Sequence, residues 1–169
     1  MLLYSGKYLR VLKKDHWEYV ERTHSNEAVV ILAVTEDKKV ILTEQFRIPV
    51  GKDVIELPAG LLGDPGSVPG EAKEEAARRE LLEETGYEAE EMELIASGPP
   101  SAGLSSEIAL FYGASGLKKV GKGGGVESEN ILVHEVPLKE VEGWLQGMEA
   151  QGKLVDPKVY AGLYWIREK

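Results

Sequence analysis

Residues 70–87 constrain the fold of this chain more than any other stretch of its sequence. Their pattern predicts an amphipathic helix that ends at Gly86, a residue able to close a helix in the left-handed conformation. Glu80 and Glu84 are four residues apart, so their carboxylates lie on one helix face, with Glu83 beside them. Like charges at this spacing repel by roughly 0.2–0.5 kcal/mol per pair, which a solvated helix tolerates better than a buried one.

A bound divalent cation would turn this repulsion into attraction. Carboxylate oxygens are hard ligands of the kind that Mg²⁺ and Mn²⁺ bind while keeping room for water and substrate phosphates. A charged surface helix is the alternative interpretation. Two features argue for the metal site. Arg78 and Arg79 offer a partner for a carboxylate, and residues 56–60 form a strand end and a turn that offers backbone carbonyls.

The spacing of these residues resembles the signature of the Nudix hydrolases. Glu71 is followed, after seven residues, by Arg79-Glu80-Leu81, and then by the pairs Glu83-Glu84 and Gly86-Tyr87. Defined residue types at fixed spacing make this match specific. The resemblance implies hydrolysis of a nucleoside diphosphate linked to another group, with a divalent metal.

The signature departs from the family pattern at its first glycine. That glycine normally stands six positions before the first glutamate, where this chain has Pro65. Gly60 is the equivalent that we expect, so residues 61–70 contain a five-residue insertion rich in Gly and Pro. The insertion alters a loop and leaves every acidic position of the signature in place.

Length, charge and cysteine count exclude several other classes of protein. The chain has 169 residues, enough for one domain with a hydrophobic core. Its net charge of -9 argues against nucleic acid or an anionic membrane as a partner. It has no cysteine, which excludes disulfides, zinc–thiolate sites and thiol nucleophiles and fits a cytoplasmic location. Residues 1–10 lack the apolar run of a signal peptide or membrane span.

The sequence pattern predicts an α+β fold, which the resemblance specifies as a Nudix-type α/β/α sandwich with a mixed sheet and an N-terminal β-hairpin extension. We expect residues 1–27 to form this extension and residues 28–169 to form the Nudix domain. The expected strands are residues 7–14, 16–23, 28–34, 39–47, 54–57, 92–97, 108–112 and 131–136. The expected later helices are residues 137–151 and 156–167, the last with Asp156 as its N-cap and Pro157 in its first position.

Three further expectations concern pairing and packing. Residues 39–47 are expected to pair antiparallel with residues 28–34 across a polar turn. Residues 58–60 are expected to form a turn after a short strand. A pattern more typical of packing than of a binding site appears in the last helix, where aromatic residues recur at helical spacing: Tyr160, Tyr164 and Trp165.

Other segments narrow the resemblance to the ADP-ribose (ADP-sugar) pyrophosphatases. These segments are residues 17–23, 44–49, 56–61, 101–105 and 126–131. The resemblance implies a homodimer whose N-terminal strands are exchanged and reach the partner's site. We therefore expect a nucleoside diphosphate sugar as the substrate and neither nucleic acid nor membrane as a partner.

The resemblance also assigns metal ligands. Glu80 and Glu84 are expected to bind Mg²⁺ or Mn²⁺, and Ala59 to add its backbone carbonyl. Glu129, on a loop before a strand, is the further ligand. An ordinary turn residue is the alternative interpretation of Ala59, and a solvated acidic loop is the alternative for Glu129.

The catalytic roles fall on Glu127, Glu129, Glu83 and Arg79. By resemblance, Glu127 or Glu129 is the general base that activates water, and the other touches the metal. Glu83 is a candidate to share this work, and Arg79 is expected to orient the carboxylates. A glutamate is already ionised at neutral pH, so such a base needs only placement beside a metal-bound water of lowered pKa.

The substrate-binding candidates begin with two arginines. Arg47 and Arg22 are expected at the phosphates or the terminal ribose, because a guanidinium binds phosphate oxygens in bidentate fashion; surface salt bridges are the alternative. Trp17 is expected to stack on adenine, with Glu18 accepting from its exocyclic amine, and a core or interface aromatic is the alternative. The resemblance adds two more substrate-binding residues, Glu56 and Leu104.

The sequence therefore predicts Mg²⁺-dependent hydrolysis of the pyrophosphate of ADP-ribose to AMP and ribose 5-phosphate. One alternative keeps the chemistry and changes the substrate to GDP-mannose, another nucleotide sugar or a dinucleoside polyphosphate. The other alternative is a nucleotide-sensing domain without turnover. The intact Glu80, Glu83 and Glu84 argue against that second alternative, because a binding domain need not keep a complete set of metal ligands.

Overall fold

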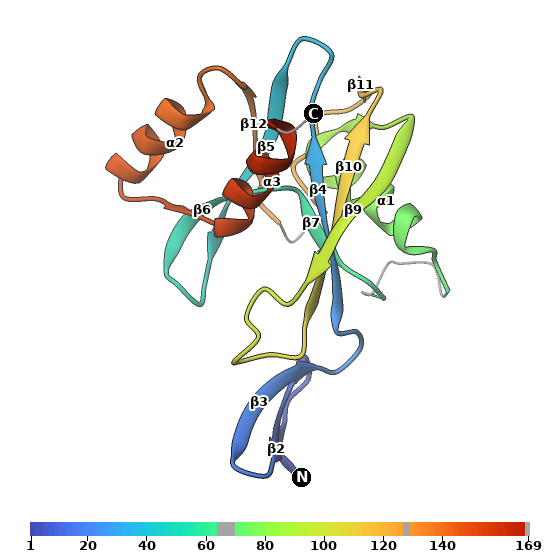
Figure 1. Ribbon diagram of the computed structural model, residues 1–169, viewed down its shortest axis with the longest axis vertical. Helices are drawn as coiled ribbons and strands as arrows, with labels where there is room; N and C mark the ends of the chain where they lie inside the picture. Colours follow the sequence, from blue (N-terminus) through green and yellow to red (C-terminus); the bar gives the residue numbers. More distant parts are fainter. Residues whose placement is uncertain (64–69, 127–128, 168–169) are drawn as a thin grey trace.

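Figure 1 shows the computed structural model, which describes residues 1–63, 70–126 and 129–167. Within these ranges the helices are α1 (Lys73–Thr85), α2 (Val141–Ala150) and α3 (Pro157–Arg167). The strands are β1 (Leu2–Ser5), β2 (Leu9–Lys14), β3 (Trp17–Arg22), β4 (Glu27–Ala33), β5 (Lys39–Arg47), β6 (Lys52–Glu56), β7 (Ala59–Leu61), β8 (Tyr87–Glu88), β9 (Glu91–Gly98), β10 (Ile108–Ser115), β11 (Lys118–Lys119), β12 (Leu132–Pro137) and β13 (Leu154–Val155).

The two larger sheets are both mixed. One has the order β7-β4-β10-β9, with β4 and β10 parallel. The other has the order β12-β5-β6-β13, with β6 and β13 parallel. In Figure 1, α1 lies on one side of the molecule, against the first sheet, and α2 and α3 lie on the other. This arrangement confirms the predicted α+β fold with mixed sheets between helices.

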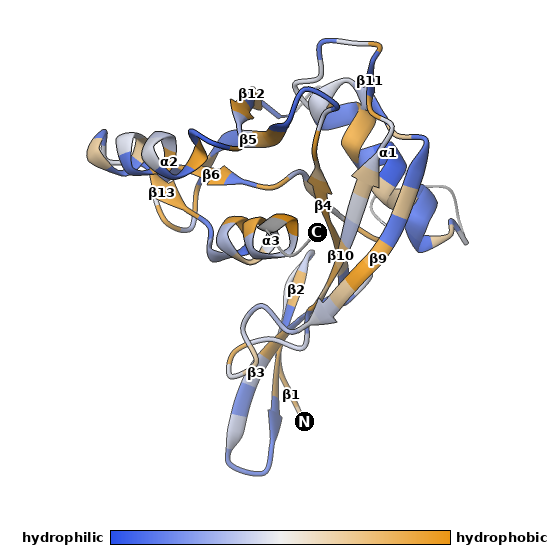
Figure 2. Ribbon diagram, turned by 45° about the horizontal axis from the view of Figure 1, so that its top comes forward, coloured by the Kyte–Doolittle hydropathy of each residue, from blue (hydrophilic) through white to orange (hydrophobic). Residues whose placement is uncertain are grey.

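β4 is buried on both faces and separates the two hydrophobic cores. Its odd-numbered residues face the core that contains Leu81 of α1, and its even-numbered residues face the core that contains Leu163 of α3. Figure 2 shows hydrophobic residues along β4 and on part of α1. A strand buried on both faces needs a continuous apolar run, and residues 28–34 supply one, as the sequence predicts.

The N-terminal residues form a separate antiparallel sheet, β1-β2-β3, that projects from the body (Figure 1). The predicted hairpin is confirmed, with Asp15 at a φ of 55° in its turn. β1 is not among the predicted strands, and its Leu2 and Leu3 are 55% and 43% exposed. Val20 of β3 ties the extension to the body, because its N–H donates to the carbonyl of Leu104 at 2.9 Å.

Two expectations about pairing are wrong. Residues 39–47 form β5, which pairs with β12 and β6; among the described residues, an isolated bridge joins Val40 of β5 to Val34, the residue after β4. Both edges of β4 are already occupied, by β10 and β7, so β5 belongs to the second sheet. The turn expected at residues 58–60 is also corrected, since Ala59 begins β7 and pairs with Val30.

Two expectations about the late helices are corrected and one is confirmed. α2 begins at Val141, because Pro137 still belongs to β12. Tyr160 and Tyr164 are 47% and 61% exposed, so they do not pack in the core. Asp156 is the N-cap of α3, as predicted, and its Oδ1 accepts the N–H of Lys158 at 2.8 Å.

Other expectations stay predictions. One of them is the boundary between the N-terminal extension and the Nudix domain at residues 27 and 28. β4 begins at this position, but the start of a strand does not establish a domain boundary. Most of the predicted insertion, residues 64–69, lies outside the described residues. In the part of the chain that the structure describes, no helix has the length and apolar character needed to cross a bilayer.

Candidate active site

α1 carries two buried carboxylates. Glu80 and Glu84 are 9% and 3% exposed, so this face of the acidic helix is not a solvated surface. The pKa of Glu84 is raised to about 8, mainly by burial; the charges of Glu80 and Glu129 contribute to this rise, and the hydrogen bond from the Ala59 N–H opposes it. Burial also raises the pKa of Glu80. The face therefore disfavours its own negative charge unless a cation joins it.

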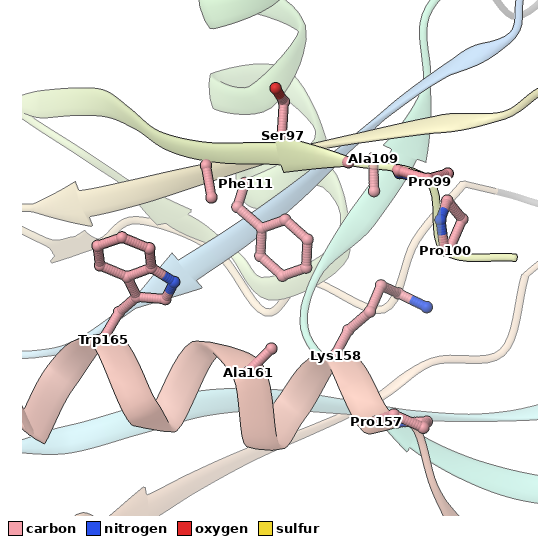
Figure 3. Close-up of a pocket in the computed structure, with 11 residues that line it drawn as sticks. Ser97, Pro99, Pro100, Ala109, Phe111, Pro157, Lys158, Ala161 and Trp165 are labelled. Carbon is pink, nitrogen blue, oxygen red and sulfur yellow. The ribbon is translucent and has the colours of Figure 1, made fainter. Parts of the chain in front are cut away.

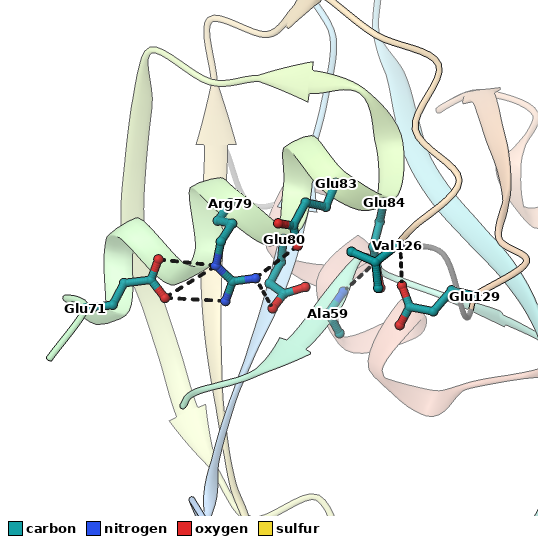
Figure 4. Close-up of polar contacts among 8 residues, drawn as sticks. All are labelled: Ala59, Glu71, Arg79, Glu80, Glu83, Glu84, Val126 and Glu129. Carbon is teal, nitrogen blue, oxygen red and sulfur yellow. Dashed lines mark hydrogen bonds and ion pairs between the residues drawn. The ribbon is translucent and has the colours of Figure 1, made fainter. Parts of the chain in front are cut away.

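Arg79 contacts three carboxylates of the signature (Figure 4). Its Nη1 lies 2.8 Å from Oε1 of Glu80 and 3.0 Å from Oε2 of Glu83, and its Nε donates to Oε1 of Glu71 at 3.2 Å. Burial alone would lower the pKa of Arg79, but the hydrogen bonds with Glu71 and the charge of Glu80 outweigh burial and raise it. These contacts fit the orienting role that the sequence predicts for Arg79.

β7 brings backbone atoms against both buried carboxylates. The N–H of Ala59 donates to Oε2 of Glu84 at 3.1 Å. A Cβ at Gly60 would lie 2.0 Å from Cδ of Glu80, so glycine is required for that carboxylate to rest on the strand. This contact supports Gly60 as the equivalent of the signature glycine. The Ala59 carbonyl as a metal ligand stays a prediction.

A glycine-rich segment joins the end of α1 to the loop of Glu129. The N–H of Gly124 donates to the carbonyl of Glu84 at 2.8 Å, and the N–H of Gly125 donates to the carbonyl of Glu83 at 3.1 Å. The φ angles of these glycines are 113° and 80°, a region that favours glycine. The last turn of the helix thereby gains donors for carbonyls that the helix itself leaves without partners.

This segment sets the position of Glu129. Oε2 of Glu129 accepts the N–H of Val126 at 3.0 Å, and a Cβ on Gly125 would lie 2.4 Å from the same oxygen. Figure 4 shows Glu129 beside Glu84 and Ala59. The other loop acid predicted from the sequence, Glu127, lies outside the described residues.

The chemistry of these side chains fits a hard divalent cation. The carboxylates of Glu80, Glu84 and Glu129 are oxygen donors of the kind that Mg²⁺ or Mn²⁺ binds, and the two on α1 are buried at an electrostatic cost that a cation would offset. Among the described residues, no group of three acidic or histidine side chains stands close enough to hold an ion as it is. Arg79 engages Glu80 and the Ala59 N–H engages Glu84, so a cation would have to compete with these contacts.

Glu80 and Glu129 open onto a cleft of about 370 Å³ that three cations also line. Each cation comes from a different element and is paired with a carboxylate. The pairs are Arg22–Glu107 (2.6 Å), Arg47–Glu56 (2.7 Å) and Lys158–Asp156. Each pairing restrains the cation while other N–H groups remain to bind an anion. The cleft therefore offers both acidic groups for a metal and cationic groups for phosphate oxygens.

The structure brings six of the predicted site residues to the lining of this cleft. Arg79, Glu83 and Glu84 lie beside Glu80 on α1 but do not line the cleft, and three substrate-binding candidates lie away from it. The predicted residues that line it are Arg22, Arg47, Glu56, Ala59, Glu80 and Glu129. Trp17 and Glu18 lie at the far end of the β2–β3 hairpin, where Trp17 is 52% exposed. Leu104 is 59% exposed where the extension meets the body. Substrate contacts by these three residues stay predictions.

Sequence reasoning misses two charged residues of the cleft. Glu107 holds Arg22, and Lys158 stands in the first turn of α3. Glu107 comes two positions after residues 101–105, which resemble the ADP-ribose pyrophosphatases. Its closeness to this segment was a sequence signal that Glu107 belongs to the site. Lys158 follows a helix N-cap and carries no local signal. The fold alone brings it to the cleft.

Comparisons with known proteins show the family of this chain. A sequence model of the NUDIX domain matches residues 24–159. A methanol dehydrogenase activator of Bacillus methanolicus is 34% identical over 141 residues, 83% of this chain and 71% of that protein. An ADP-ribose pyrophosphatase of Bacillus subtilis (strain 168) is 38% identical over 114 residues, 67% of this chain and 59% of that protein. A GDP-mannose pyrophosphatase of Citrobacter koseri is 33% identical over 139 residues, 77% of this chain and 70% of that protein.

A solved structure shares the fold. The crystal structure of an ADP compounds hydrolase superposes with a TM-score of 0.75, over 99% of this chain and 89% of that one. Its sequence is 22% identical, so the likeness is evidence for the fold alone.

Proposed function

Because this chain belongs to the Nudix family, whose domain matches residues 24–159, we propose that it hydrolyses the pyrophosphate of ADP-ribose to AMP and ribose 5-phosphate. One observation carries the proposal: Glu80 of the Nudix signature, Glu129 and three paired cations line a single cleft, and the buried Glu84 lies one helical turn from Glu80. Acids bind a divalent metal, and paired cations bind phosphate oxygens. A pyrophosphate ester is the group that needs both.

Each residue of the cleft has a separate task in this reaction. Glu80 and Glu84, with Glu129, would hold Mg²⁺ or Mn²⁺, which when bound lowers the pKa of water and neutralises charge on phosphate oxygens. Arg79 keeps Glu80 and Glu83 in place. Arg47 and Arg22 bind and orient the phosphates, held by Glu56 and Glu107.

The chemical step is hydrolysis at one phosphorus. The oxygen of a water molecule bonds to that phosphorus, and the bond from the phosphorus to the bridging oxygen breaks. A glutamate takes the proton of the water, and the departing phosphate keeps the bridging oxygen. Glu129 or Glu127 is this general base, and Glu83 is the next candidate.

A second substrate has a specific observation in its favour. One relative at 33% identity is a GDP-mannose pyrophosphatase, so GDP-mannose is the second candidate substrate for this chain. The buried acids argue against a domain that only senses nucleotides, because such a domain has no need of the electrostatic cost they carry.

A homodimer is part of the proposal. The N-terminal sheet exposes apolar side chains, among them Leu2 and Trp17. Exposed apolar residues gathered on one sheet commonly mark an interface. We infer that the sheet packs on a second copy, where Trp17 stacks on adenine and Glu18 accepts from its amine.

The absence of cysteine supports a cytoplasmic location.

A substrate panel tests the proposed function. The purified chain is incubated with ADP-ribose, GDP-mannose and a dinucleoside polyphosphate, in Mg²⁺ and in EDTA, and the products are identified by mass spectrometry. We expect the highest kcat/KM for ADP-ribose, with activity lost in EDTA. Glu80→Gln should be inactive, whereas Glu75→Gln, on the exposed face of the same helix, should not. Binding of ADP-ribose without turnover would support the sensing alternative.

A further inference from the structure

A second hollow continues from the catalytic cleft and has no role in the function so far. It is a groove of about 290 Å³ between α3 and the strands β9 and β10. Figure 3 shows the ring of Phe111 and the indole of Trp165 turned toward the gap, with Ala161 and Lys158 on the facing helix. Pro99 and Pro100 border one end. The lining is therefore mainly apolar and aromatic, with Lys158 as its charged group.

The groove and the catalytic cleft are continuous. Pro100, Ala109 and Lys158 line both. The start of α3 is fixed beside the catalytic residues, because the N–H of Asp156 donates to the carbonyl of Ile55 at 2.9 Å, one residue before Glu56. Lys158 therefore stands at the passage from the cleft into the groove, held by its ion pair with Asp156.

The aromatic residues of α3 divide between two faces. Trp165 lines the groove, whereas Tyr160 and Tyr164 point to solvent, at 47% and 61% exposed. Trp165 itself is 37% exposed, so the groove is open along one side. A ligand in it can lay an apolar face on the aromatic rings while its polar groups stay in water, which avoids the cost of burying hydroxyls without partners.

We propose that this groove binds the terminal sugar of the nucleotide sugar, and that Lys158 contacts the phosphate that carries this sugar. The five-membered ring of a ribose in its envelope form has one face rich in C–H groups and a rim of hydroxyls, which suits an open aromatic groove. Its phosphate would lie at the passage, where the ammonium of Lys158 is available. This inference rests on the proposed function, in which Trp17 of a second copy, and not the groove, holds the adenine.

Filling the groove tests the proposal. Ala161 is exposed and lines the groove, so Ala161→Phe adds a ring there without entering the core. Tyr164→Phe, on the solvent face of the same helix, is the control. Inhibition by the two products then reports on the two ends of the substrate separately. Ala161→Phe should weaken inhibition by ribose 5-phosphate about 10-fold or more and leave inhibition by AMP within about 2-fold, since shape exclusion in a pocket is worth about 10–200-fold.

A second variant tests the passage. Lys158→Met keeps the length of the side chain and removes its charge, so it should raise the KM for ADP-ribose and weaken ribose 5-phosphate more than AMP. Thermal unfolding of each variant checks that the fold is intact. Loss of AMP inhibition in Ala161→Phe would place the nucleotide in the groove and overturn the proposal, as would unchanged inhibition by both products. A wild-type chain that hydrolyses no nucleotide sugar would instead refute the proposed function, so the two failures are distinct.

Discussion

Replacing Glu84 with glutamine should stabilise the metal-free protein while removing its activity. The side chain is 3% exposed, and its pKa is about 8 against an ordinary value of 4.5. The folded protein therefore keeps a proton that the unfolded chain releases between these values. The resulting stability is fully present below the unfolded pKa and is lost as pH rises through the folded pKa, at about 1.4 kcal/mol per pH unit and about 5 kcal/mol in total.

Glutamine escapes this loss because it has no charge to bury. Its carbonyl still accepts the N–H of Ala59, but its amide hydrogens gain no partner, at a cost of about 1–3 kcal/mol. Near neutral pH the wild-type protein has already lost about 3 kcal/mol of the stability that protonated Glu84 provides. Glu84→Gln should therefore raise the free energy of unfolding by up to about 2 kcal/mol. The difference in unfolding free energy between the variant and the wild type should grow by about 1.4 kcal/mol per pH unit.

Urea unfolding in EDTA, followed by circular dichroism between about pH 5 and pH 8, measures this slope. Glu75→Gln, whose side chain is 64% exposed on the same helix, should stay within about 0.5 kcal/mol of the wild type. With Mg²⁺ present, turnover of ADP-ribose by Glu84→Gln should fall by about 10²-fold or more. A difference that does not change with pH would refute the burial argument. Turnover near the wild-type value at saturating Mg²⁺ would refute the metal assignment.

Three other outcomes are expected. Glu129→Gln or Glu127→Gln should lower kcat with little change in KM, because a general base acts mainly in the transition state; full activity in both variants and in the double variant would move the base elsewhere. Trp17→Ala should raise the KM for ADP-ribose by about 10-fold or more, in line with about 1–3 kcal/mol per stacked base, and sedimentation should show a dimer. A dimer with unchanged KM would leave Trp17 as an interface residue only. Gly60→Ala should lose far more activity than Gly143→Ala, because a Cβ at Gly60 meets Glu80 at 2.0 Å whereas one at Gly143 meets nothing within 4 Å; equal activities would contradict this reading of the contact.

Features that depend on neighbours along the chain were predictable from the sequence. The end of α1 at Gly86 follows from local backbone conformation, and its φ of 75° confirms the prediction. The burial of β4 follows from a continuous apolar run, and the N-cap of α3 follows from Asp156 and Pro157. The spacing of the signature was enough for the family, because one helix places Glu80 and Glu84 on one face whatever surrounds it.

Features that depend on which edge or cavity an element occupies required the tertiary structure. The pairing of β5 was predicted wrongly, because nothing local tells that β10 and β7 already occupy both edges of β4. The burial that raises the pKa of Glu84, and the contact that requires glycine at position 60, arise only when β7 lies against α1.

The cations of the cleft best illustrate the difference between what local sequence predicts and what packing decides. Arg22, Arg47 and Lys158 are far apart in the sequence and lie on β3, β5 and α3. The two arginines were identified by resemblance, but Lys158 follows an ordinary helix start and carries no signal of its own. Spacing along a helix is set by its 3.6-residue turn, so the sequence by itself determined the acidic half of the site. The meeting of separate elements at one cleft depends on long-range packing, so only the tertiary structure decided that Lys158 joins the two arginines there.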